Sequence, residues 1–148
     1  MTFENIVVAV DFSDHSKAAA AAAAELAKQN GATLHFVHAF EIVTPLVSPY
    51  QVAIPDLYLR ESRDSAKKQL DAMVETARAA GAKVETHFTE APAAHAITRI
   101  AEDIGADLIV VGTRGNTGLK HLVLGSVAER TLRLAPCSVL TIKMPEDD

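Results

Sequence analysis

The chain has 148 residues, of which 49% are hydrophobic and 22% are charged, a composition typical of one soluble globular domain with its own core. No apolar run approaches the roughly 18–20 residues of a membrane span, and the acidic start lacks the basic segment of a secretory signal. The formal net charge of −5 argues against general nucleic-acid binding. Because Cys137 is the only cysteine, no internal disulfide can form, which predicts a reducing, cytoplasmic location.

The predicted elements alternate between strand and helix along the chain. Residues 5–10 form a continuous apolar, β-branched run, which is typical of a strand covered on both faces of a parallel sheet. Ser13 is a good N-cap for the helix that follows, and Gly31, Gly81 and Gly105 are expected to end helices. In chain order, the expected elements are strand 5–10, helix 14–30, strand 33–40, helix 56–80, strand 83–89, helix 92–104, strand 107–112, helix 126–134 and strand 137–143.

This alternation predicts the α/β class. We expect a single domain over residues 1–148, built on an open five-stranded parallel sheet with helices on both faces and right-handed crossovers. Residues 41–55 hold three prolines and no clear periodicity, which predicts a long surface loop. The tail from about residue 144 is expected to fray.

Four of the seven glycines lie in one stretch, DLIVVGTRGNTGLKHLVLGSVA, which runs from Asp107 to Ala128. An apolar strand is followed there by a polar loop, and Gly125-Ser126 then opens a helix. Bare N–H groups that end at a helix N-terminus favour an anion, phosphate above all. Between Gly112 and Arg133 there are four basic residues and one acid, so this segment carries 4 − 1 = +3 and the rest of the chain −8.

The loop differs from the two commonest phosphate loops. No G-x-x-x-x-G-K-[ST] string occurs, and a G-x-G-x-x-G turn would follow the first strand rather than the fourth. From composition alone, a flexible connection and a run of solvated charges therefore remain open. Asp11 follows the first strand, at the carboxyl edge where open α/β sheets bind ligands. Its alternative role is a charge that favours the N-terminus of the next helix.

The spacing Gly112-x-x-Gly115, nine residues, Gly125-Ser126 resembles the ATP-binding signature of the universal stress protein family. The resemblance covers nearly the whole chain and includes the segments IVVAVDFS, VHAF, AEDIGADLIVVGTRG and LGSVAER. It implies a Rossmann-like sheet of strand order 3-2-1-4-5, in which Asp11 and Gly112 would face one crevice. Two departures are Glu90-Ala91-Pro92, where the family often has G-x-P, and Ala128, where some ATP-binding members carry threonine.

The resemblance also implies a role for each residue of the predicted nucleotide site. Three glycines and a serine would bind the phosphate groups. The residue after the serine would add a further N–H donor, and an arginine side chain could reach phosphate or solvent. Asp11 would accept a ribose hydroxyl. The remaining positions would neighbour or wall the adenine. The full set is Gly112, Gly115, Gly125 and Ser126 for phosphate, then Val127 and Arg114, Asp11 for ribose, and Val10, Ala39 and Val111 for the base.

The function implied by the resemblance is that of an ATP-binding regulatory protein of the stress response. ATP or another adenine nucleotide, with Mg²⁺ or Mn²⁺ carried by its phosphates, would tune contact with a protein partner. The family also implies a homodimer through the edge strand from Cys137 to Lys143. The alternatives are a slow ATPase or nucleotidyl-transfer enzyme that uses Arg114 or Lys120 with a bound metal, and a scaffold that binds no nucleotide.

No catalytic residue and no metal-ligating set are predicted. His35 and His38 on the second strand, with His87 on the third, suggest a metal site at first sight. Because positions three apart on a strand point to opposite faces, we interpret these histidines as structural. His121, within the glycine-rich loop, is the one candidate general base there, and a solvated loop histidine is the favoured interpretation.

Overall fold

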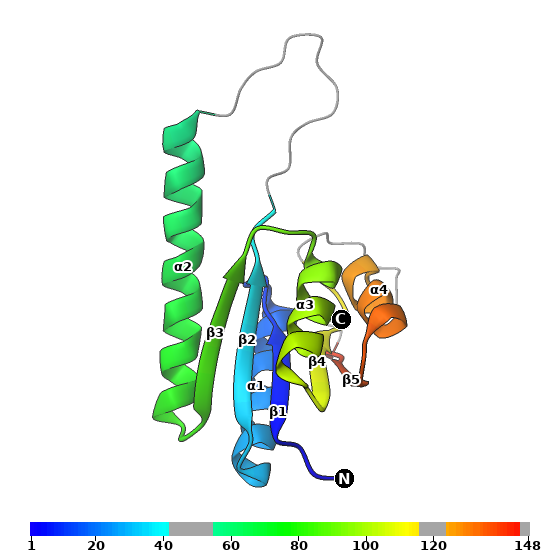
Figure 1. Ribbon diagram of the computed structural model, residues 1–148. Coiled ribbons are helices and arrows are strands. Elements are labelled where there is room, and N and C mark those ends of the chain that lie inside the picture. Colours follow the sequence, from blue (N-terminus) through cyan, green and yellow to red (C-terminus); the bar gives the residue numbers. More distant parts are fainter. Residues whose placement is uncertain (42–54, 116–123, 146–148) are drawn as a thin grey trace.

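The computed structural model describes residues 1–41, 55–115 and 124–145, and these hold every element that the sequence predicts (Figure 1). No boundary differs from its prediction by more than one residue. The central part of the predicted 41–55 loop, most of the glycine-rich loop and the last three residues lie outside the described residues. The elements are β1 Asn5–Ala9, α1 Asp14–Asn30, β2 Thr33–Ala39, α2 Asp56–Ala79, β3 Lys83–Thr89, α3 Ala93–Ile104, β4 Leu108–Gly112, α4 Ser126–Leu134 and β5 Ser138–Ile142.

All five strands of the described sheet are parallel, in the order β3-β2-β1-β4-β5. This confirms both the α/β class and the strand order that the family resemblance implied. Val7 of β1 lies opposite His35 of β2 on one side and Ile109 of β4 on the other. The chain therefore winds outward from β1 to β3 and then returns to β4, which makes the β1–β4 junction the switch point where such sheets bind ligands.

The side chains of the central strands alternate between two buried layers. Ile6 and Val8 pack with Phe36 in the layer toward α1 and α2, whereas Val7 and Ile97 belong to the layer toward α3 and α4. Figure 1 shows these helix pairs on opposite sides of the sheet. Because both faces are covered, β1 is apolar from Ile6 to Ala9 rather than alternating, as its sequence predicted.

Helix α1 contacts the sheet through small side chains. Its alanines place four methyl groups in the interior, and each is less than one-tenth exposed: Ala19, Ala20, Ala23 and Ala27. Such short side chains allow the helix backbone to lie close to the strands, and alanine is also the strongest helix former. Gly31 and Gly105 end α1 and α3 in the left-handed conformation, at φ 66° in both cases, as predicted. No described helix has the length and apolarity that crossing a bilayer requires.

Asp107 ties the beginnings of β1 and β4 together, and we expect its removal to weaken the fold in a pH-dependent way. Its carboxylate accepts N–H donors from Glu4 at 2.7 Å and Asn5 at 2.9 Å. These two bonds, Asn5 first, lower the pKa of the Asp107 carboxyl below its ordinary value. The stabilisation is therefore present above the unfolded-state pKa and is lost as the pH falls through the folded-state pKa.

Asp107→Ala should lower the free energy of unfolding at neutral pH by about 1–2 kcal/mol, because hydrogen bonds to a charged group contribute about 1.5–3 kcal/mol and solvent weakens these partly exposed ones. Urea titrations from neutral pH down to about pH 3 should show a smaller acid-dependent loss in this variant than in the wild type. Asp71→Ala, on the exposed side of α2, serves as the control. Equal acid dependence in wild type and Asp107→Ala would contradict the prediction.

Candidate functional site

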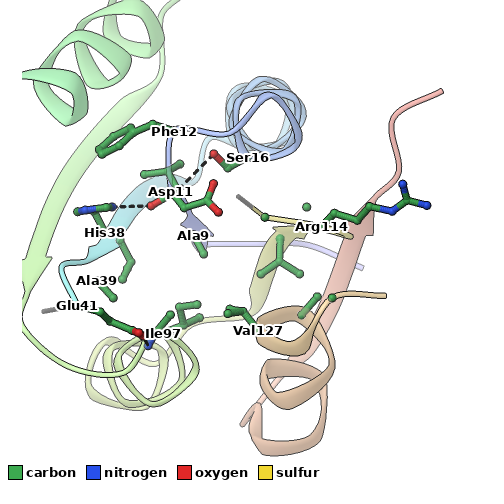
Figure 2. Close-up of a pocket in the computed structure, with 18 of the residues that line it drawn as sticks. Ala9, Asp11, Phe12, Ser16, His38, Ala39, Glu41, Ile97, Arg114 and Val127 are labelled. Atoms are coloured by element: carbon green, nitrogen blue, oxygen red, sulfur yellow. Dashed lines mark hydrogen bonds between the residues drawn. The ribbon is translucent and has the colours of Figure 1, made fainter. Parts of the chain in front are cut away.

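A cavity of about 490 Å³ opens at the carboxyl ends of β1, β2 and β4 (Figure 2). Helix α3 and the start of α4 form the opposite wall, and residues of α2 close one side. The structure brings all of the predicted nucleotide-site residues to this cavity, although they come from four separate parts of the chain. They are Val10, Asp11, Ala39, Val111, Gly112, Arg114, Gly115, Gly125, Ser126 and Val127.

The turn after β1 holds Asp11 in a fixed position. One carboxylate oxygen, Oδ1, accepts the backbone N–H of Ser13 at 3.0 Å and also its hydroxyl, while the Asp11 N–H donates to Ser16 Oγ at 3.2 Å. Phe12 adopts φ 67°, a left-handed conformation that is strained for a residue with a bulky side chain. Asp11 is therefore part of the local turn, rather than only a charge near the helix.

His38 supports the same wall and was not predicted to belong to the site. Its ring lies 4.5 Å from the Phe12 ring, measured between centroids, and its Nδ1–H donates to the Val10 carbonyl at 2.8 Å. The Val10 N–H meanwhile donates to the Val37 carbonyl at 2.9 Å. Both backbone polar groups of Val10 thus have protein partners, so Val10 contributes mainly packing surface to the cavity.

Glycine has a different structural role at each of the three motif positions. A Cβ on Gly112 would lie 2.9 Å from the backbone carbonyl of His15, so this glycine allows α1 to approach β4. A Cβ on Gly115 would lie 2.6 Å from Asp11 Oδ2, inside the cavity. Gly125 donates its N–H to the Thr113 carbonyl at 2.6 Å, which closes the base of the loop. Gly112 was expected to cradle phosphate directly, but its missing side chain is explained by helix packing.

Three helices direct their N-termini toward the cavity. They differ in which side chain, if any, accepts the free N–H groups of the first turn. The Ser13 side chain caps α1 by accepting the Ser16 N–H, and a Glu41 carboxylate oxygen accepts the Ala93 N–H at the start of α3, at 2.6 Å. Helix α4 begins after Gly125, which has no side chain to cap it. Uncapped N–H groups and the helix dipole favour a negative charge. The start of α4 is therefore the end best suited to a phosphate.

The basic residues around the loop contribute less to the cavity than the sequence suggested. Figure 2 shows the Arg114 side chain extending away from the cavity, although its backbone lines it. Arg133 donates to Glu129 at 2.7 Å, one turn away on α4. Lys120 and His121 lie outside the described residues. Backbone N–H groups, rather than these side chains, are thus the main anion-binding feature that the structure describes.

The family of the chain follows from comparison with known proteins. A family model described as the universal stress protein family matches residues 2–143. The chain belongs to the universal stress protein family. The resemblance inferred from the glycine spacing is therefore confirmed at the level of the family.

Individual universal stress proteins match over nearly their full length. Universal stress protein YxiE of Bacillus subtilis is 36% identical over 147 residues, which cover 95% of this chain and 99% of the relative. Among solved structures, UspA from Lactobacillus plantarum has 25% identity and a TM-score of 0.73, covering 96% of this chain and 99% of its own. A universal stress protein from Archaeoglobus fulgidus in complex with dAMP has 28% identity and a TM-score of 0.68, covering 97% and 100%.

The departure at Glu90 forms a contact of its own in this universal stress protein. Glu90, where the family often has glycine, lies 2.5 Å from the guanidinium of Arg63 on α2. Arg63 in turn lies 5.7 Å from the centre of the Phe40 ring beside the cavity. The turn between β3 and α3 is thereby joined to α2, away from the start of α4. This contact therefore lies beside the far rim of the cavity, away from the predicted phosphate end.

Proposed function

We propose that this universal stress protein binds an adenine nucleotide, ATP foremost, as a regulatory ligand. The observation that carries the proposal is the start of α4 at the cavity, beside Gly125 and opposite Asp11, where the N-cap residue has no side chain to cap the helix. The cavity of about 490 Å³ lies in the range of small-molecule and cofactor sites. The Archaeoglobus fulgidus relative, whose structure holds dAMP, supports the adenine nucleotide as ligand class.

The proposed placement follows the polarity of the cavity from end to end. Phosphate oxygens would accept N–H donors from Ser126, Val127 and the loop glycines, with Mg²⁺ or Mn²⁺ carried by the phosphates. Asp11, held by its turn, would accept a ribose hydroxyl. The base would lie on the apolar surface at the other end, which is formed by Val10, Ala39, Val111 and Ile97.

The ionisable side chains that line the described cavity favour regulation over catalysis. His38 donates to Val10, Glu41 caps α3, and Arg114 extends away from the cavity. Asp11 is held by Ser13. Three of these side chains are held by hydrogen bonds within the protein, and the fourth points away from the cavity. We therefore propose that nucleotide binding changes a surface that a partner protein contacts, rather than leading to catalytic turnover.

The test is to denature freshly purified protein, chromatograph the released small molecules, and then titrate nucleotide-free protein with ATP, ADP and AMP by calorimetry. We expect an adenine nucleotide in the supernatant and one binding site per chain. Asp11→Asn keeps the acceptor for Ser13 but removes the charge, so it should bind more weakly while remaining folded. An empty supernatant together with no calorimetric binding would overturn the proposal. Conversion of ATP to ADP with Mg²⁺ would establish the enzyme alternative.

We further propose a homodimer formed through β5. The strand lies at an edge of the described sheet, paired only with β4, and Leu140 at its centre presents an apolar side chain that is 37% exposed. The other edge, β3, carries Lys83 and Glu85, the kind of charged residues that protect edge strands from pairing.

Leu140→Lys should weaken this dimer by roughly tenfold or more, because it places a charge in the apolar contact. Sedimentation velocity over a range of protein concentrations measures the effect. Lys83→Ala, on the opposite edge, is the control and should leave the dimer unchanged. A wild-type protein that sediments as a monomer at micromolar concentration would contradict the proposed dimer.

We place the protein in the cytoplasm as part of the same proposal. Cys137 is a free, half-buried thiol. Burial raises the pKa of the Cys137 thiol, and the Asp107 carboxylate raises it further, so the thiolate is scarce at neutral pH. A single protonated thiol is suited to a reducing compartment.

A further inference from the structure

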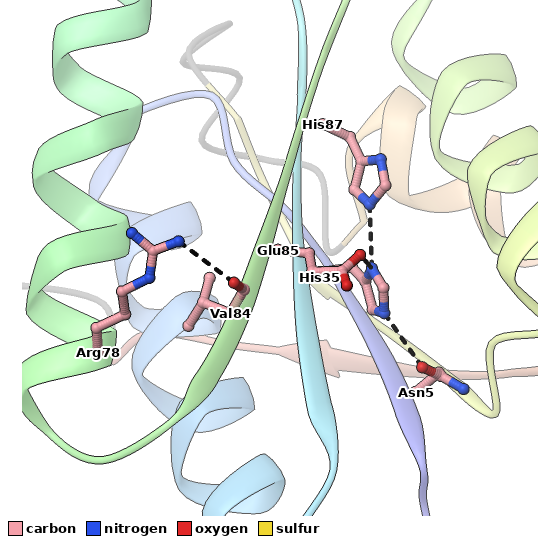
Figure 3. Close-up of polar contacts among 6 residues, drawn as sticks. All are labelled: Asn5, His35, Arg78, Val84, Glu85 and His87. Carbon is pink, nitrogen blue, oxygen red and sulfur yellow. Dashed lines mark hydrogen bonds and ion pairs between the residues drawn. The ribbon is translucent and has the colours of Figure 1, made fainter.

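A cluster of polar side chains lies on the sheet face toward α3, and its residues are separate from those that line the candidate site (Figure 3). His35 comes from β2, and Glu85 and His87 come from β3. In the β2–β3 register, Glu85 lies directly opposite His35, and His87 lies opposite Val37, two residues further along. Because residues two apart share a face, all three side chains project to the same side.

The three side chains bring their donor atoms close to one point. His35 Nδ1 lies 3.0 Å from His87 Nε2 and 3.5 Å from Glu85 Oε2. One nitrogen or oxygen from each residue falls within a set whose members are all within 4.8 Å of one another. Donor atoms that share a tetrahedral zinc at about 2.0–2.2 Å lie roughly 3.3–3.5 Å apart. Shifts of less than about one ångström would therefore give all three a common metal.

Asn5 sets the orientation of the buried histidine. The Nε2–H of His35 donates to Asn5 Oδ1 at 3.2 Å, which leaves the lone pair of His35 on Nδ1, the atom that faces Glu85 and His87. A second hydrogen bond that fixes ring and tautomer in this way is typical of metal-ligating histidines. His87 Nε2 then supplies the proton of the contact between the two imidazoles.

The surroundings of the cluster suit an accessible site with one further coordination position. His35 is only 4% exposed and is held by the neighbouring strands. His87 is half-buried, and the Glu85 side chain is 63% exposed, so solvent reaches the cluster from the side of β3. Two imidazoles and one carboxylate match the ligand set of zinc sites that keep a water in the fourth position.

We propose that His35, Glu85 and His87 bind one divalent cation of the zinc class, with water as the fourth ligand. Imidazole donors favour Zn²⁺, Ni²⁺ and Cu²⁺ over Mg²⁺ and Ca²⁺, which prefer oxygen ligands. On binding, His87 shifts its proton from Nε2 to Nδ1 through solvent, so that Nε2 offers a lone pair to the cation; both imidazoles stay neutral and no electron transfer is involved. The bound cation joins edge strand β3 to β2 and, through Asn5, to β1, so metal binding stabilises the fold.

This assignment revises the prediction that the histidines form no metal-ligating set. His38 does lie on the other face, in contact with Phe12 and Phe88, so the argument that separated it from His35 is confirmed. The pair that matters is His35 and His87, 52 residues apart in the chain. Only the strand register brings them together, and the sequence alone does not specify it.

The proposal is tested by titrating tag-free, nucleotide-free protein with Zn²⁺ in a calorimeter, with Mg²⁺ as the comparison cation. We expect one Zn²⁺ per chain and no comparable binding of Mg²⁺. His87→Ala and Glu85→Gln should each weaken Zn²⁺ binding by at least about tenfold, and Asn5→Ala by roughly 10–100-fold, the range for a residue that orients a ligand. His95→Ala, on the exposed surface of α3, is the matched control and should bind like the wild type.

A measurement on the wild type keeps the proposal testable if a variant fails to fold. Zn²⁺ should shift the ¹⁵N resonances of His35 Nδ1 and His87 Nε2 and leave those of His38 unchanged. Gly115→Val, in the nucleotide cavity, should leave Zn²⁺ binding unaltered. Unchanged affinity in His87→Ala, an equal loss in His95→Ala, or Mg²⁺ binding as tight as that of Zn²⁺ would each overturn the assignment.

Discussion

Gly115→Val is expected to weaken nucleotide binding strongly while the protein remains folded. Gly115 does not adopt a positive φ, so a side chain there causes no backbone strain. The new Cβ would lie 2.6 Å from Asp11 Oδ2, and the two methyl groups beyond it would occupy the space between Asp11 and the start of α4. The clash is with one side-chain oxygen rather than with backbone, so a small shift of the Asp11 carboxylate relieves it, but the volume taken is that of the proposed ligand.

We expect the affinity for ATP to fall by roughly 100-fold or more, about 3 kcal/mol of binding free energy. The free energy of unfolding of the nucleotide-free protein should change by less than about 1 kcal/mol. Calorimetry and urea titration on the same preparation separate the two effects. Gly105→Ala is the matched control: at φ 66° it should cost about 1–2 kcal/mol of stability and leave ATP binding intact. Wild-type affinity in Gly115→Val would place the nucleotide elsewhere.

The fold was predictable because each local signal agreed with the global pattern. The β-branched run of β1, the N-cap at Ser13 and the helix-ending glycines all specify elements without reference to distant residues. Strand order is different, since it depends on pairings between segments far apart in the chain. It came from the family resemblance rather than from periodicity, and the structure confirms it.

The candidate site was predictable only where a residue acts through its backbone or its place at a strand end. Asp11, Gly115 and Gly125 fall in this class, and all three line the cavity. Glu41 and His38 do not, because their partners Ala93 and Val10 are 52 and 28 residues away in the chain. Such contacts follow from the tertiary fold and leave no local pattern in the sequence.

Equal motif positions also hide unequal physical roles. From the sequence, Gly112 and Gly115 belong to the same signature and were given the same phosphate-binding role. In the structure, what lies beside Gly112 is the backbone of α1, whereas beside Gly115 it is a side chain at the cavity. Backbone cannot move aside without moving its helix, so the two glycines should respond differently to the same substitution.

Gly112→Val is accordingly expected to destabilise the fold itself. Its Cβ would lie 2.9 Å from both the carbonyl carbon and the carbonyl oxygen of His15, a separation that ordinary packing does not allow. This clash is relieved only if α1 moves away from β4. The movement would loosen the close packing between the sheet and the small side chains of α1. Overpacking of this kind costs about 1–3 kcal/mol for small additions, so Gly112→Ala should fall in that range and Gly112→Val at or above its upper end.

Urea titration of nucleotide-free protein measures the loss of stability in the two Gly112 variants. Gly115→Ala and Gly115→Val are the matched controls in the same motif. The Gly112 variants should unfold at progressively lower urea, while the Gly115 variants stay near the wild type. Because α1 begins at the turn that holds Asp11, its displacement should also weaken ATP binding in Gly112→Val, as a consequence of the packing defect. If Gly112→Ala unfolds at the wild-type midpoint, close contact between α1 and β4 is not the reason for the glycine, and a direct role at the phosphate regains support.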